Sequence, residues 1–253
     1  MNKFKDKTIL ITGSARGIGF GIAKAFAEEG ADLVLTDIRE NILQQAKEEL
    51  EAKYGVSVLA QKADGSDEKA VESVIQNTIQ KFGRLNVVIN NAQASKSGFA
   101  FMEQTKDDLN LALSSGLYSA FFYMQKAFPY LKESQGSVIN FASSAGMCGQ
   151  PGQSTYAASK EAIRGMSRCI AAEWGPYNIN VNIVCPLAMT EHLKSWKAEH
   201  PDLYSKTIHD IPLNRFGDPK DDIGRVCTFL ASEDANYITG ETISVQGGIG
   251  LHA

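Results

Sequence analysis

The chain has 253 residues, 43% of them hydrophobic, and a formal net charge of −4. This length suits one large α/β domain with a sizeable core, and the acidic balance with scattered basic residues argues against nucleic acid or an anionic membrane as a partner. No stretch is typical of a signal peptide or a membrane span. The four cysteines and four histidines lack the spacing of disulfides or metal ligands. We expect a cytoplasmic protein without a metal site.

Short apolar, β-branched segments alternate with longer segments of helical periodicity along the chain. Strands are predicted at residues 8–12, 32–37, 56–61, 86–90, 137–142, 179–184 and 241–245. Helices are predicted near residues 18–29, 40–53, 67–82, 105–132, 155–174 and 219–231. Strands so continuous in apolar residues are buried on both faces, as in a parallel sheet covered by helices. No repeat or linker divides the pattern, so residues 1–253 are predicted to form one domain.

The segment 187–210, LAMTEHLKSWKAEHPDLYSKTIHD, interrupts this alternation. It is mixed helical and polar, and it lies between the sixth predicted strand and the last predicted helix. Its place in the chain predicts a lid over a substrate site.

The sequence TGSARGIG follows the first predicted strand, and its three glycines are Gly13, Gly17 and Gly19. Such glycines allow a tight turn and a close approach of the backbone to a pyrophosphate at a helix N-terminus. An ordinary glycine-rich turn is the alternative. Asp37, at the end of the second strand, is where an acid would bind an adenosine ribose, so NAD is favoured. NADP remains an alternative because Arg16 and Arg39 could meet its 2′-phosphate.

Tyr156 and Lys160 lie one helical turn apart in STYAASK, residues 154–160. A nearby ammonium favours the phenolate, so we predict that Lys160 lowers the pKa of Tyr156 and makes it a general acid and base. Ser143, at the end of the fifth predicted strand, is placed to bind a substrate oxygen. The alternative is an ordinary solvated Tyr–Lys pair on a helix surface.

Four motifs together resemble the short-chain dehydrogenase/reductase family: TGSARGIG, NNA at 90–92, the spacing of Ser143, Tyr156 and Lys160, and YITGETISVQGG at 237–248. The resemblance implies an α/β fold, a doubly wound Rossmann-type parallel sheet of seven strands. It implies hydride transfer between a nicotinamide cofactor and a secondary alcohol or ketone, usually in a homotetramer. The cofactor-binding residues that it implies are Gly13, Ser14, Arg16, Gly17, Ile18, Gly19, Asp37, Asp64, Asn91, Tyr156, Lys160, Pro186 and Thr190.

Three residues depart from the family pattern. Gly116 stands where the family usually has an asparagine that helps a water relay protons; we expect an extra water there, and Gly116→Asn to leave turnover equal or higher. Gln93 and Leu187 each replace a glycine, which favours a reshaped substrate pocket. The pocket residues that we predict are Gln93, Met147, Gln150 and Leu187.

These features predict an NAD-dependent alcohol dehydrogenase or ketone reductase acting on a small molecule. A second interpretation is a catalytically weak nicotinamide-binding regulator, which Gly116 and Gln93 support and the intact Ser143, Tyr156 and Lys160 oppose. A third is a lyase or epimerase on the same scaffold, although such relatives usually have a different glycine spacing.

Overall fold

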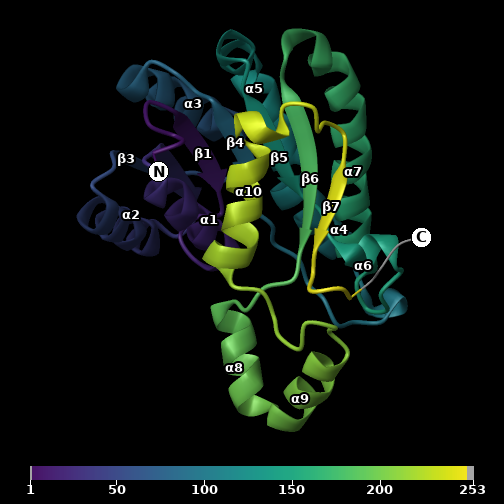
Figure 1. Cartoon of the computed structure of the whole chain (residues 1–253). Helices are drawn as coiled ribbons and strands as arrows, with labels where there is room; N and C mark the ends of the chain where they lie inside the picture. Colours follow the sequence, from purple (N-terminus) through teal and green to yellow (C-terminus); the bar gives the residue numbers. More distant parts are fainter. Residues whose placement is uncertain (1, 250–253) are drawn as a thin grey trace.

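One parallel sheet organises the computed structural model, which describes residues 2–249. Its strand order is β3-β2-β1-β4-β5-β6-β7 (Figure 1). The strands are β1 (Thr8–Thr12), β2 (Asp32–Asp37), β3 (Val58–Lys62), β4 (Val87–Asn90), β5 (Ser137–Phe141), β6 (Asn180–Pro186) and β7 (Thr242–Val245). Each predicted strand is therefore confirmed, with ends that differ by at most two residues.

The helices are α1 (Gly17–Glu28), α2 (Glu40–Tyr54), α3 (Glu68–Phe82), α4 (Lys106–Ala112), α5 (Ser119–Ser134), α6 (Ser144–Met147), α7 (Ser154–Trp174), α8 (Glu191–Glu199), α9 (Pro201–His209) and α10 (Arg225–Leu230). Short 3₁₀ turns span Phe101–Glu103, Gly175–Tyr177 and Glu233–Ala235. Two π-helical turns span Leu113–Tyr118 and Pro219–Gly224; they are called here π-turn 113–118 and π-turn 219–224. None of the helices in the described part of the chain is long and apolar enough to cross a bilayer.

Helices cover both faces of the sheet, as the continuous apolar strands require. One apolar cluster joins the sheet to α1, α2 and α10, through residues such as Phe26, Leu43 and Leu230. The other joins the opposite face to α3, α5 and α7, and Tyr123 of α5 is its largest fully buried side chain. The predicted doubly wound α/β fold is confirmed.

The strand order reverses between β1 and β4. From β1 the chain proceeds outward to β2 and β3, then crosses back to β4 on the other side of β1. The loops after β1 and β4 thus leave the sheet toward opposite faces. This opens a crevice at the carboxyl ends of the strands, where ligands bind in folds of this class.

The predicted helix at 105–132 is wrong as a single element, because π-turn 113–118 separates α4 from α5. Two serines bond back to the preceding turn: Ser114 Oγ and Ser115 Oγ both donate to the Leu111 carbonyl, at 3.3 and 2.6 Å. Such side-chain bonds compete with the backbone ladder and loosen a helix locally. π-Turns of this kind are frequent at functional sites.

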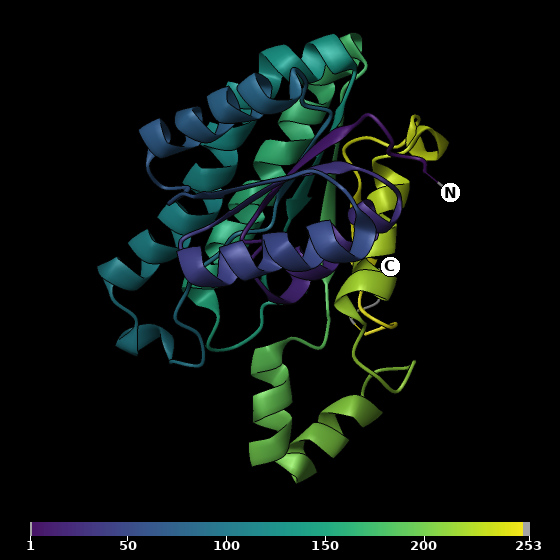
Figure 2. The same ribbon diagram turned by 90° about the vertical axis from the view of Figure 1, so that its left-hand side faces the viewer.

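Helices α8 and α9 project beyond the carboxyl edge of the sheet (Figures 1 and 2). Their packing against each other includes the rings of Trp196 and Tyr204, with centroids 6.4 Å apart. After α9 the chain returns to the sheet, and the backbone of π-turn 219–224 packs closely against α1. A Cβ built on Gly21 would overlap Pro219, and one on Gly224 would lie 2.7 Å from the Ala25 Cβ.

Candidate active site

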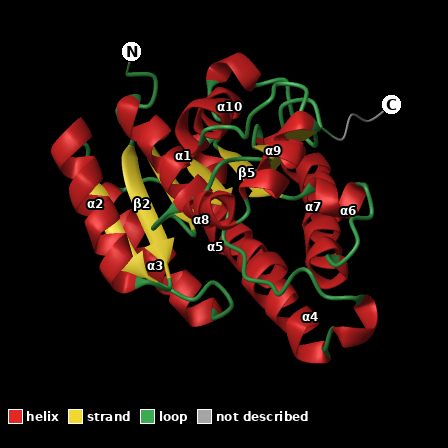
Figure 3. Cartoon of the chain, turned by 90° about the horizontal axis from the view of Figure 1, so that it is seen from below, coloured by secondary structure: helices red, strands yellow, loops and turns green. Residues whose placement is uncertain are grey.

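The carboxyl ends of the strands bring the predicted functional residues to one edge of the sheet, which Figure 3 shows from below. The loop after β1 carries the three glycines, β2 ends on Asp37, and β4 is followed by Asn91. The next two strands add Ser143 after β5 and Pro186 at the end of β6. One cleft at this edge is lined by Gly13, Asp37, Arg39, Asp64, Asn91 and Gln93.

The loop after β1 has the backbone geometry of an anion cradle. Gly13 and Gly17 have φ angles of 62° and 60°, a region that L-residues with a Cβ seldom adopt. A Cβ on Gly13 would lie 2.9 Å from the Ala92 Cα, and one on Gly19 would overlap the Gly13 carbonyl. No acidic side chain occupies the first turn of α1, and no side chain caps its described start. The free amides there can therefore bind a phosphate.

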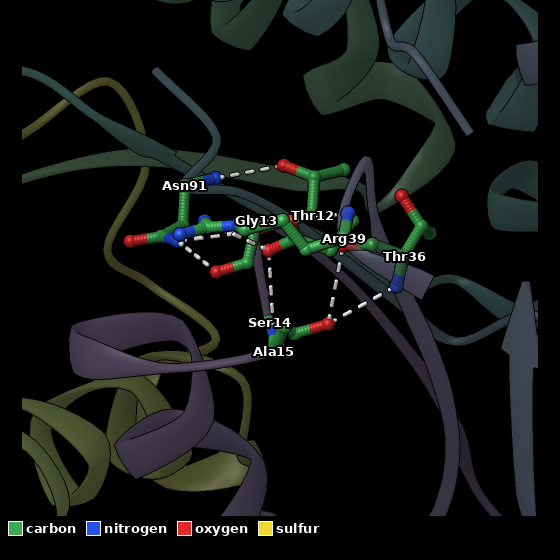
Figure 4. Close-up of polar contacts among 8 residues, drawn as sticks. Thr12, Gly13, Ser14, Ala15, Thr36, Arg39 and Asn91 are labelled. Carbon is green, nitrogen blue, oxygen red and sulfur yellow. Dashed lines mark hydrogen bonds and ion pairs between the residues drawn. The ribbon is translucent and has the colours of Figure 1, made fainter. Parts of the chain in front are cut away.

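Side chains fix this loop from two neighbouring segments (Figure 4). Asn91 Nδ2 donates to the carbonyls of Thr12 and Gly13, at 3.0 and 3.1 Å. Thr12 Oγ1 accepts from the backbone amides of Asn91 and Ala92. Asn91 is thus a support of the loop. Thr12 was not predicted, although a polar residue ending an apolar strand was the available signal.

The predicted ribose acid is already engaged by an arginine. Asp37 is buried, and its Oδ1 accepts from the amide and the Nε of Arg39 at 3.1 and 3.0 Å. Arg39 Nη2 and the Ala15 amide donate to the other oxygen, each at 3.3 Å. The carboxylate therefore lies at the predicted place, and its charge is balanced by Arg39. Ser14 is buried between the loop and β2, where its Oγ accepts from the Thr36 amide at 3.0 Å.

The remaining predicted cofactor residues lie around the same crevice. Asp64 is exposed and accepts from the Ser66 amide and Oγ at 2.9 and 2.7 Å. Thr190 caps α8, and its Cγ2 would lie 3.8 Å from a Cβ on Gly17, so the start of α8 stands over the glycine loop. Arg16 immediately precedes α1 and is exposed, and Ile18 in its first turn is half-buried.

Ser143, Tyr156 and Lys160 come together as predicted. The Tyr156 hydroxyl lies beside the Ser143 side chain, which acts to lower its pKa, and the Lys160 Nζ lies 5.7 Å from the centroid of the Tyr156 ring. Lys160 is 3% exposed and donates to the Phe141 carbonyl, at the end of β5, at 2.8 Å. The surface-pair alternative does not describe a lysine this deeply buried.

The prediction that Lys160 lowers the pKa of Tyr156 is wrong for this structure. Burial raises the pKa of the Tyr156 phenol, and the hydrogen bond with Ser143 opposes that rise. Burial also lowers the pKa of Lys160, to about 8. The sequence showed the one-turn spacing but not the depth of the site, and desolvation disfavours the charged form of both groups.

The expected water in place of a side chain at Gly116 is also wrong. The carboxamide of Gln93 occupies this space, because a Cβ built on Gly116 would overlap the Gln93 Oε1 and lie 2.9 Å from its Cδ. Gly116→Asn alone would therefore collide with Gln93, and the expectation of equal or higher turnover for that change is withdrawn.

The four predicted pocket residues do not share one cavity. Gln93 lines the cleft with Asp37, whereas Leu187 lines a separate groove beside Pro212 and Leu213. Met147 ends α6 and is half-buried, with its sulfur 3.9 Å from the sulfur of Cys185. Gln150 is exposed in the loop before α7.

The residues present fit a nicotinamide dinucleotide. The glycine loop and the uncapped start of α1 suit its pyrophosphate, Asp37 with Arg39 suits the adenosine ribose, and the edge near Tyr156 suits the nicotinamide. Within residues 2–249, the histidines, cysteines and carboxylates form no group of three or more that could hold a metal ion.

Comparison with known proteins agrees with this geometry. A family model described as enoyl-(acyl carrier protein) reductase matches residues 13–250. A 12alpha-hydroxysteroid dehydrogenase of Clostridium sp. is 53% identical over 99% of both chains. The 3-oxoacyl-(acyl-carrier-protein) reductase FabG of Thermotoga maritima is 34% identical over 98% of this chain and 99% of its own.

Solved structures show the same fold over nearly the whole chain. Levodione reductase has a TM-score of 0.91 at 32% identity, covering 97% of this chain and 98% of that one. A xylitol dehydrogenase with bound NAD⁺ has a TM-score of 0.90 at 26% identity, covering 97% and 100%. The chain belongs to the short-chain dehydrogenase/reductase family and is an oxidoreductase of that family.

Proposed function

We propose that the chain interconverts a secondary alcohol and a ketone, with Tyr156 as the general acid and base. One observation carries this proposal: Tyr156, beside Ser143 and one turn from the buried Lys160, lies at the same sheet edge as the glycine loop. A proton-transfer group beside a dinucleotide cradle is the arrangement that alcohol oxidation needs.

The protein's own residues supply binding and proton transfer. A nicotinamide held at this edge would supply the acceptor for the hydride of the carbinol carbon. Ser143 holds the substrate oxygen, while Tyr156 takes the hydroxyl proton, so that the C–H and O–H bonds break as the C=O bond forms. Lys160 would hold the cofactor's ribose, and the positive charge of a bound oxidised nicotinamide would favour the Tyr156 phenolate that accepts the proton. In ketone reduction Tyr156 donates the same proton.

A hydroxysteroid is the substrate class that we propose. The relative named 12alpha-hydroxysteroid dehydrogenase matches at 53% identity from end to end. Near the N-terminus of α7, the loop after β4 exposes the apolar side chains of Phe99, Phe101 and Met102, which are 48%, 74% and 90% exposed. Gly98 of this loop donates to the Gly152 carbonyl at 2.9 Å, which ties the apolar loop to the segment before Tyr156. This apolar rim suits a large alicyclic substrate.

We propose NAD as the preferred cofactor, because Asp37 stands at the end of β2, where a 2′-phosphate would meet its carboxylate. Arg39 reduces that repulsion through its ion pair with Asp37. Arg39 is therefore the side chain whose rotation would admit NADP.

The remaining proposals concern the whole molecule. We propose that residues 1–253 act as one unit in which α8 and α9 form the lid, and that the protein is cytoplasmic. We also propose a homotetramer. The segment from α4 to α5 carries Leu111, Tyr118 and Phe121, which are 39%, 50% and 43% exposed. Apolar and aromatic side chains of this kind suit an interface between subunits.

The test measures turnover of the purified protein by the absorbance of the reduced nicotinamide. The substrates are a 12α-hydroxysteroid, the same steroid without its 12-hydroxyl, a 3-oxoacyl thioester and a small secondary alcohol, each with NAD(H) and with NADP(H). We expect the highest kcat/KM with the 12α-hydroxysteroid. Preference for the thioester would overturn the substrate class. Cofactor binding without turnover of any substrate would favour the regulatory protein instead.

A further inference from the structure

Gln93 reaches from the loop after β4 into π-turn 113–118. Its Nε2 donates to the Ala112 carbonyl at 3.0 Å, to the Ala94 carbonyl at 2.9 Å and to Ser115 Oγ at 3.4 Å. Ser115 Oγ in turn accepts from the Ala94 amide at 2.9 Å. One carboxamide thus connects two segments that are about twenty residues apart in the sequence.

Gly116 is the residue that admits this carboxamide. Its hydrogen faces Gln93, since an added Cβ would overlap the Oε1 and lie 2.9 Å from both the Gln93 Cδ and the Ser159 Oγ. Gly116 is buried and has no positive φ angle, so the backbone there does not require glycine. Glycine is required because the Gln93 carboxamide fills the space that a side chain at position 116 would need. A side chain at 116 and the glutamine at 93 therefore exclude each other.

The contact continues into the helix that carries Tyr156 and Lys160. The Ala112 carbonyl, which accepts from Gln93, also accepts from Ser159 Oγ at 2.8 Å. Ser159 is fully buried and directly precedes Lys160 in α7. A single carbonyl oxygen is therefore held by a side chain of the β4 loop on one side and a side chain of α7 on the other.

We propose that Gln93 is a positioning residue. Through the Ala112 carbonyl and Ser159 it fixes α7, and therefore the position of Lys160 beside Tyr156. Gly116 leaves the space that the Gln93 carboxamide needs. This inference rests on the proposed function for its effect on turnover. The Gln93 Nε2 is the atom that makes this connection, because the Gln93 Oε1 is buried and has no hydrogen-bond partner among the described residues.

A double-mutant cycle tests the exchange between the two positions. We expect Gln93→Ala to lower kcat about 10- to 100-fold, as small displacements of catalytic groups do, while cofactor affinity changes little. Gly116→Asn alone should lower both kcat and the thermal midpoint. The combined variant should recover part of both losses, because the new asparagine can then occupy the space that the glutamine left, while its Cβ still lies 2.9 Å from the Ser159 Oγ. Gln45→Ala, an exposed glutamine of α2, is the matched control and should change nothing.

Gln93→Glu tests the donor separately. Glutamate has the same shape but no N–H to donate, so it should fail to replace glutamine and should lower kcat as alanine does. Activity equal to that of the parent would contradict the proposal, as would a combined variant no better than Gly116→Asn.

A measurement without turnover distinguishes this inference from the proposed function. The pKa of Lys160 can be followed by NMR of labelled lysine side chains in the cofactor-free protein. The titratable groups near it are Tyr156 on α7 and Cys185 on β6. Gln93→Ala should raise the pKa of Lys160 toward its ordinary value as α7 loosens. An unchanged pKa overturns the inference even if the enzyme is active, and a shifted one supports it even if no tested substrate turns over.

Discussion

The two halves of the crevice are built in different ways. On the cofactor side, the glycine loop, Ser14, Asp37 and Asn91 are held by backbone conformation and by contacts between adjacent strands. On the catalytic side, Lys160 donates to the Phe141 carbonyl at the end of β5, and the neighbouring Ser159 donates to the Ala112 carbonyl, which also accepts from Gln93. Both halves depend on side chains that meet only after the chain has folded. Those of the first half support the glycine loop, whereas those of the second support Lys160, so substitutions in the second half should affect chemistry more than cofactor binding.

The largest expected effect is on the catalytic side. Tyr156→Phe keeps the ring and removes the proton-transfer group, so kcat should fall about 10²- to 10⁴-fold while cofactor affinity stays near that of the parent. Turnover assays and cofactor titration measure the two quantities. Tyr237→Phe, at a fully exposed tyrosine, is the control; similar kcat values for the two variants would contradict the role of Tyr156.

The burial of Lys160 should lower the free energy of unfolding of the protein. Its folded pKa of about 8 lies below the ordinary value of 10.5, so between these two values the unfolded chain binds more protons than the folded one. The free energy of unfolding must therefore rise with pH across this window, and the lysine's full cost is present below it.

Replacement of that lysine by an apolar side chain removes this pH dependence. Lys160→Met should be more stable than the parent below pH 8, by at most about 3 kcal/mol, and the difference should disappear as the pH approaches the ordinary lysine value. Denaturant unfolding of both proteins at several pH values measures it. A difference independent of pH would show that Lys160 is not desolvated.

On the cofactor side, the effect should appear in binding. Gly13→Ala places a Cβ 2.9 Å from the Ala92 Cα at a φ of 62°, so the loop must move away from its present geometry. Restoring that geometry on binding costs about 1–2 kcal/mol, and cofactor affinity should fall about tenfold or more. Gly55→Ala is the matched control, because its φ is 68° and no atom lies within 4 Å of the added Cβ. If both variants bind the cofactor equally well, close approach at Gly13 is unimportant.

The smallest effect should separate the two cofactors. Arg39→Gln removes the guanidinium that bonds Asp37, leaving the carboxylate to repel a 2′-phosphate. The ratio of kcat/KM for NAD over NADP should then rise several-fold, in line with one partly exposed charge contact of about 1 kcal/mol. Steady-state kinetics with both cofactors measure it, and a fall in the ratio would contradict the assigned roles of Asp37 and Arg39.

Much of the fold was predictable because each strand is a short apolar segment between clear helical patterns. The helix breaks were not: the apolar periodicity runs through residues 105–132, and π-turn 113–118 depends on serine bonds to the Leu111 carbonyl that periodicity does not show. For residues 187–210, only a mixed helical character could be inferred, and the structure resolves it into α8 and α9.

The site was predictable where chemistry follows from adjacent residues. Spacing predicted that the glycine loop, Asp37 and the group of Ser143, Tyr156 and Lys160 lie at one sheet edge, and the structure places them there; their roles stay predictions. Gln93 and Gly116 were noticed separately as departures, yet their packing against each other was missed, since nothing in the sequence joins positions 23 residues apart. The direction of the Tyr156 pKa was also missed, because burial cannot be inferred from a one-turn spacing.

The backbone contact between π-turn 219–224 and α1 anchors one base of the proposed lid. Pro219 lies directly on Gly21, which is in the same helix whose first turn faces the glycine loop. The other base is anchored as well, because the Met189 amide donates to the Gly217 carbonyl at 2.8 Å and the Leu187 amide to the Val245 carbonyl at 2.9 Å. Thr190 at the start of α8 lies over the glycine loop, so any movement of the proposed lid would uncover the pyrophosphate cradle together with the substrate end of the crevice.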